Sequence, residues 1–286
     1  MTKKTNNKAG CKILFTVLGL YIFMLLPAAA LAEIKSAIFS PTRIILEDRN
    51  RSETVQLINR DPVTNTYKIS TVLMKMDDQG NLAEIKNPTP EQVAVKDMFR
   101  FSPKRVTLEP GAYQNIRLMV RKPADLPTGE YRVHLRAAAL PPAPGTAKTS
   151  VQRGNIHLNI LVHVSIPIIV RHGQGSVSLT PQTCVLEKES KSLAVGLRRT
   201  GEYSAYFGLV AYVRGADGTK QKIAQKLGVG YYPPATQRTF HLPLEQPELV
   251  RTLSGQRIFL EIINYEKRKK ELAQGPWEFV LNEAGL

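Results

Sequence analysis

The chain has 286 residues, of which 39 are lysine or arginine and 24 are aspartate or glutamate, so its formal net charge is +15. Such a balance suits nucleic acid, anionic lipid or acidic protein partners. Two cysteines cannot form the disulfide framework of a small secreted domain, so the cores must come from apolar packing.

The first 32 residues predict a secretory signal. Several lysines precede an apolar centre, Ile13–Leu26, and Ala30-Leu31-Ala32 follows as a small-residue cleavage site. A membrane anchor is the alternative, but the apolar stretch is short for a span and the cleavage pattern follows at once. We therefore expect a chain that begins at Glu33, is exported, and makes no stable membrane insertion after cleavage. Export argues against a nucleic-acid partner.

The predicted elements before residue 172 are short strands separated by turn residues, which is typical of all-β sandwiches. We expect strands near 34–39, 43–47, 53–59, 66–76, 98–101, 105–108, 113–121, 130–138 and 155–170. The proline- and glycine-containing segment Leu140–Gly154 predicts a mobile loop.

After a glycine-containing linker near 171–176 the same rhythm resumes. We expect strands near 177–180, 183–187, 192–198, 205–214, 220–228, 237–242, 257–264 and 276–281. No convincing helical periodicity interrupts them. The predicted division is a signal over 1–32, a first sandwich domain over 33–171 and a second over 172–286.

One strand stands out by its length. From residue 156 to 168 every even position is aliphatic, and most odd positions are polar. Thirteen alternating residues are about twice the usual strand length, with one apolar face. Pro167 lacks an amide proton and is tolerated mainly at an edge or a bulge. Because a long apolar edge is normally an aggregation hazard, we expect this face to meet a partner.

Motifs for catalysis or metal binding are missing from the sequence. There is no glycine-rich phosphate loop, Gly-x-Ser-x-Gly elbow or His-Glu-x-x-His. His157 and His163 share a strand face but are six residues apart, roughly 20 Å along a strand. Cys184 lies in a short apolar strand and is predicted to be a buried small hydrophobe. We expect no enzyme, no cofactor and no metal.

Four stretches, in order and spacing after an export signal, resemble the periplasmic pilus chaperones of the chaperone–usher pathway, the PapD-like family of immunoglobulin fold. They are Ser40–Ile45 with its Thr-Arg-Ile-Ile run, Phe101–Leu118, Glu130–Pro142, and the alternating strand that finishes Ser165-Ile166-Pro167-Ile168. The Ser-Ile-Pro ending is more similar to the archaic branch. The resemblance implies two immunoglobulin-like domains in tandem, with pilus subunits and an outer-membrane usher as partners.

In that family the long strand of the first domain is donated to a pilus subunit that lacks its last sandwich strand. The resemblance thus implies a site along the aliphatic face. Its residues are Ile156, Leu158, Ile160, Val162, Val164 and Ile166.

Arg43 matches the family arginine that binds the carboxylate at the subunit's C-terminus, a role that suits a guanidinium fork. The better-known branch has a lysine near the end of the long strand as a second ligand, but Pro167 stands there and no lysine occurs in 154–170. Arg117 is the predicted substitute. Two other functions stay open at this point: a secreted two-domain adhesin or structural protein, and a periplasmic metal-binding sandwich.

Overall fold

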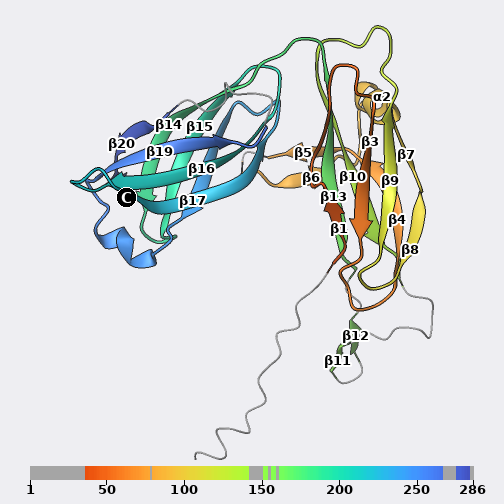
Figure 1. The fold of residues 1–286 in the computed structure, drawn as a ribbon, viewed down its shortest axis with the longest axis horizontal. Helices are drawn as coiled ribbons and strands as arrows, with labels where there is room; N and C mark the ends of the chain where they lie inside the picture. Colours follow the sequence, from red (N-terminus) through yellow and green to blue (C-terminus); the bar gives the residue numbers. More distant parts are fainter. Residues whose placement is uncertain are drawn as a thin grey trace, which may run out of the picture. The chain divides into compact units, whose positions relative to one another are not determined.

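The computed structural model describes residues 36–77, 79–141, 151–153, 156–158, 161–266 and 275–283. The predicted signal, residues 1–32, lies outside this described part. The protein is all-β and consists of two immunoglobulin-like β-sandwiches in tandem, as predicted, each with its own apolar core (Figure 1). No helix in the described residues is both long and apolar enough to span a bilayer.

The first sandwich packs a four-stranded sheet on a five-stranded sheet. The first sheet has, in spatial order, β1 (Ile38–Ser40), β3 (Ser52–Ile58), β9 (Tyr113–Val120) and β7 (Phe99–Ser102). The second has β2 (Ile44–Leu46), β13 (His163–His172), β10 (Gly129–Ala139), β4 (Asn65–Val72) and β8 (Arg105–Leu108). Alternate side chains of both sheets fill the core, so Val55, Ile116, Val133, Leu135 and Ile168 are fully buried.

The strand expected over 66–76 is divided at Leu73. β4 ends at Val72, and β5 (Met74–Met76) leaves the sheet to form a hairpin with β6 (Leu82–Glu84). A fork of two hydrogen bonds, 2.7 and 3.1 Å long, joins Arg136 of β10 to the Glu84 carboxylate. This hairpin therefore lies against polar side chains of β10.

A short helix, α2 (Pro90–Asp97), was not predicted. It buries none of its residues, so its apolar periodicity is too weak to recognise. A sequence signal was nevertheless present, because Thr89 and Gln92 form a reciprocal capping box around Pro90 at the first helical position.

The prediction of one continuous strand over 155–170 is wrong. β13 begins at His163, whereas β12 (Ile156–Leu158) forms a separate hairpin with β11 (Val151–Arg153), inside the segment expected to be a loop. The reason lies in the pairing partner. β10 ends at Ala139, and His163 already pairs with Ala138, so the described residues just before it, Leu161 and Val162, belong to no strand of that sheet. Alternation predicts which side chains share one face of a strand, but it does not predict where hydrogen-bonded pairing with the neighbouring strand ends.

The second sandwich packs two four-stranded sheets. One contains β18 (Gln237–Pro243), β15 (Ser192–Thr200), β14 (Ser178–Glu187) and β21 (Asn282–Glu283). The other contains β17 (Lys220–Tyr231), β16 (Ala205–Arg214), β19 (Arg257–Asn264) and β20 (Trp277–Val280), and a 3₁₀ turn spans Pro247–Arg251. β14 joins two predicted strands, with a shift of register between Pro181 and Thr183. Cys184 is buried in this core, as predicted.

Candidate functional site

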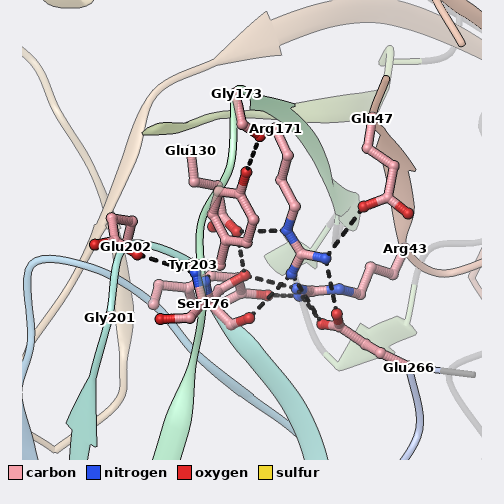
Figure 2. Close-up of polar contacts among 12 residues, drawn as sticks. Arg43, Glu47, Glu130, Arg171, Gly173, Ser176, Gly201, Glu202, Tyr203 and Glu266 are labelled. Atoms are coloured by element: carbon pink, nitrogen blue, oxygen red, sulfur yellow. Dashed lines mark hydrogen bonds and ion pairs between the residues drawn. The ribbon is translucent and has the colours of Figure 1, made fainter. Parts of the chain in front are cut away.

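Two arginines and two glutamates from distant parts of the chain converge near the end of β13. Arg43 directly precedes β2, Glu130 lies on β10, Arg171 lies on β13, and Glu266 follows β19 of the second sandwich (Figure 2). Glu130 and Arg171 are placed by sheet register, since they are directly opposed across the β10–β13 ladder. With Ser204, which precedes β16, these residues are called the arginine–glutamate cluster below.

Arg171 is at the centre of the cluster, and its side chain is 3% exposed. It donates from Nε to Glu130 Oε2 at 3.2 Å, from Nη1 to Glu266 Oε2 at 2.9 Å and from Nη2 to the Ser204 carbonyl at 3.0 Å. Burial alone opposes its charge, but the hydrogen bond and charge of Glu266, together with Glu130, outweigh burial and raise the pKa of Arg171. Its guanidinium thus joins both sandwiches through charge-assisted bonds.

Arg43 is held beside Arg171 and is almost as buried, with 8% of its side chain exposed. Its Nη2 donates to Ser204 Oγ at 2.8 Å and to Glu266 Oε1 at 3.3 Å, and its Nη1 donates to the Tyr232 hydroxyl at 2.9 Å. Its Nε is buried and has no partner in the described structure. Arg43 therefore keeps donor capacity that none of the described residues uses.

A hollow of about 460 Å³ opens at Arg43. Arg43, Arg171 and Glu266 contribute polar walls, while Tyr206 and Tyr265 contribute aromatic ones. The Arg43 guanidinium lies 5.3 Å from the centre of the Tyr206 ring, close enough for a cation–π contact. A carboxylate entering this hollow would meet a desolvated guanidinium flanked by aromatic rings.

Two further residues near Arg43 were missed by the sequence analysis. The Arg132 guanidinium lies 3.8 Å from the Tyr232 ring centre, and its Nη1 is buried without a partner in the described part of the chain. Burial lowers the pKa of Arg132, and the charge of Arg43 adds to this effect. His134 is 1% exposed; burial, then the charges of Arg132 and Arg43, lower its pKa to about 3. Their alternation on β10 with Glu130 was the available signal.

Arg117 is not brought to this cluster. It is exposed on β9, in the opposite sheet of the first sandwich, where it pairs with Thr54 on one side and Ser102 on the other. It does not line the hollow at Arg43.

The predicted donor residues lie at and before the start of β13. Val162 and Val164 are half-buried, and Ile166 is 5% exposed within the first core. Ile156 and Leu158 belong to β12, with side chains outside the description, and Ile160 lies outside the described residues altogether.

One edge of β13 is open over part of its length. β10 pairs with it from His163 to His172, but on the other side β2 pairs only with Ile168–Val170. Within the described structure, the stretch from His163 to Pro167 thus has a sheet neighbour on one side. Pro167 lies at this edge, as its missing amide proton predicted.

Comparison with known proteins finds a family model that matches the first sandwich. Residues 37–173 match the model of the pili and flagellar-assembly chaperone PapD N-terminal domain. A search of the curated proteins found no match.

Solved chaperone structures align over most of the chain but superpose loosely. Pseudomonas aeruginosa CupB2 chaperone is 16% identical, covers 86% of this chain and 100% of its own, and gives a TM-score of 0.43. A chain of the CsuC–CsuE pre-assembly complex from archaic chaperone-usher Csu pili of Acinetobacter baumannii is 11% identical, covers 87% of this chain and 100% of its own, and gives a TM-score of 0.41. A chain of the Salmonella enterica SafA pilin–SafB chaperone complex is 18% identical, covers 87% of this chain and 98% of its own, and gives a TM-score of 0.42.

The first sandwich, over residues 37–173, therefore matches the PapD N-terminal domain model. The match supports the predicted family resemblance for that part of the chain. The assignment to the archaic branch stays a prediction.

Proposed function

We propose that this protein is a periplasmic chaperone that binds pilus subunits by donor-strand complementation and delivers them to an outer-membrane usher. The observation that carries the proposal is the open edge of β13, with its aliphatic face, in a domain that matches the chaperone family. Export through the predicted signal is consistent with it.

The aliphatic face continues outward from the first core. Ile166 and Ile168 are buried within that core, Val164 packs against it from a half-buried position, and Val162 is half-buried as well. An incomplete sandwich that added this strand would gain main-chain hydrogen bonds at the open edge and would cover the even side chains. We propose that Val162 and Val164, with Leu158 and Ile160 before them, fill the partner's groove. Ile166, being part of the chaperone's own core, anchors the base of the strand.

Strand donation is tested by Ile160→Asp, since an inserted aliphatic side chain contributes roughly 1.5–3 kcal/mol when buried. Co-expression with a tagged pilus subunit should then yield no co-purified complex. His163→Asp is the matched control, because His163 is exposed on the opposite side of the strand. Normal capture by Ile160→Asp would refute donation by this face.

We also propose that Arg43 binds the carboxylate at the subunit's C-terminus, with Arg132 rather than Arg117 as the second cation. Both Arg43 and Arg132 have a buried donor without a partner in the described structure, and the charge of Arg43 acts on Arg132. Arg117 is exposed on another sheet.

Arg43→Ala should weaken subunit binding by about 1.5–3 kcal/mol, the scale of a hydrogen bond to a charged group. Arg43→Lys should restore only part of this loss, because lysine lacks the planar fork. Arg132→Ala should weaken binding as well, and Arg117→Ala should leave it unchanged. The measurement is repeated with a subunit whose last residue is amidated. Equal losses by Arg43→Ala for the acid and the amide would contradict the assignment of Arg43.

A further inference from the structure

We infer that Glu266 is paired with Arg43 in the free protein and competes for it with an incoming carboxylate. Glu266 thereby sets how strongly the site prefers a peptide with a C-terminal carboxylate over one with a neutral C-terminus. This inference rests on the proposed function, since it concerns the same hollow. It assigns to Glu266 a positioning role toward Arg43.

The two arginines hold Glu266 unequally. Arg171 donates to both of its oxygens, at 2.9 Å from Nη1 to Oε2 and at 3.3 Å from Nη2 to Oε1. Arg43 makes only one contact with it, from Nη2 to the same Oε1 at 3.3 Å. Glu266 can therefore release Arg43 while it keeps its two contacts with Arg171. Glu266 is therefore an exchangeable partner of Arg43, whereas its two hydrogen bonds hold it to Arg171.

The backbone around Glu266 presents its side chain from the wall of the hollow. The N–H of Glu266 donates to Asn264 Oδ1 at 2.8 Å, and the N–H of Tyr265 donates to the Tyr206 carbonyl at 3.1 Å. Tyr206 and Tyr265 line the hollow together with Glu266. An acid entering the hollow toward Arg43 thus approaches the position that the Glu266 carboxylate already holds.

The balance of charge favours exchange. Arg43 and Arg171 lie among three carboxylates, with Glu130 and Glu266 in hydrogen-bond contact and Glu47 at 3.7 Å from Arg171. Arg132 adds a third cation near Arg43, so three arginines already balance three carboxylates. A fourth carboxylate would meet like charges at short range in a desolvated place, which is unfavourable. Once Glu266 is neutral, an incoming acid restores the original number of charges. Glu266→Gln should therefore raise the affinity for an acid and leave the affinity for an amide nearly unchanged.

The test uses a fluorescent synthetic strand peptide of alternating valine and threonine, roughly nine residues long to match an ordinary strand. It is made with a free C-terminal carboxylate and, separately, with a carboxamide. Fluorescence anisotropy gives the dissociation constants of both for wild-type protein, Glu266→Gln and Glu53→Gln. Glu53 is the matched control: it lines the same hollow and is exposed, but it accepts from the backbone N–H of Thr54 instead of Arg43.

We expect Glu266→Gln to raise the preference for acid over amide by about threefold or more, since a hydrogen bond to a charged group is lost only from the competitor. Glu53→Gln should change it less than about twofold because salt screens exposed charges. A merely structural role of Glu266 would weaken both peptides together. Glu266→Asp, which shortens the side chain and so loosens its contact with Arg43, is the second variant should glutamine disturb folding. It should shift the preference in the same direction but by less, because the negative charge stays.

An unchanged or reduced acid preference in both Glu266 variants, with wild-type protein still preferring the acid, would overturn the inference alone. Absence of any acid preference in wild-type protein and variants would instead overturn the anchoring role of Arg43, and the inference with it.

Discussion

Arg171→Ala should strongly destabilise the protein, because it removes the cation shared by two buried carboxylates. The side chains of Glu130 and Glu266 are 2% and 7% exposed, so water cannot replace the lost partner. Removing one member of a buried ion pair costs about 3–5 kcal/mol. Glu130 keeps the N–H and hydroxyl of Ser204 as donors, at 2.9 and 2.8 Å, which places our expectation at about 3 kcal/mol, the lower end of that range.

Urea unfolding at pH 7 measures this loss. Fluorescence of Trp277, the single tryptophan, follows the second sandwich, and far-ultraviolet circular dichroism follows both. Two probes are needed because two domains need not unfold in one step. Arg257→Ala is the control: Arg257 and Glu278 form an ion pair of 3.1 Å whose side chains are 74% and 47% exposed. It should cost less than about 1 kcal/mol. If the two variants unfold at the same urea concentration, the cluster does not stabilise the fold as argued.

Three other properties can be tested on the same protein. The pKa of His134 is lowered to about 3, so the unfolded chain binds this proton first and stability falls as pH drops from 6.5 toward 3. Between pH 7 and pH 5 the free energy of unfolding falls by about 2 kcal/mol from this cause. His134→Leu should flatten the dependence of stability on pH, and a variant profile identical to wild type would refute this origin. Burial raises the pKa of the Cys184 thiol to about 12, so a thiol reagent should label it only after unfolding; rapid labelling of native protein would contradict this. Asn59 donates to three carbonyls and accepts from the Tyr67 hydroxyl, so Asn59→Asp should cost about 2–4 kcal/mol in thermal unfolding, and an unchanged melting temperature would contradict that network.

The all-β class and most strand positions could be predicted from the sequence, because they depend on local features. Alternating side chains define a strand face, and turn residues such as those around Pro110 and Gly111 separate the strands. Cys184 was placed in a core for the same reason. Resemblance to a family picked out Arg43 from short motifs. None of these inferences needed to know which strand lies beside which.

Where strand pairing ends, and which residues form the candidate site, depend on neighbours that are remote in the chain. The strand expected to begin near Ile156 pairs with β10 only from His163 onward, because β10 stops at Ala139 and offers no further backbone partner. The sequence does not distinguish Arg117 from Arg132 as a cation, yet strand pairing places Arg117 at an exposed position of one sheet and Arg132 in the other sheet, near Arg43.

Glu266 shows this dependence most clearly. In sequence it is one acid after β19, next to the basic run that follows it. Only the packing of the second sandwich brings it to Arg43 and Arg171, which are 223 and 95 residues away along the chain. Periodicity and turn chemistry are local and can be read along the chain, whereas desolvated charge pairs depend on which surfaces meet, so the tertiary structure alone decided the partners of Arg43.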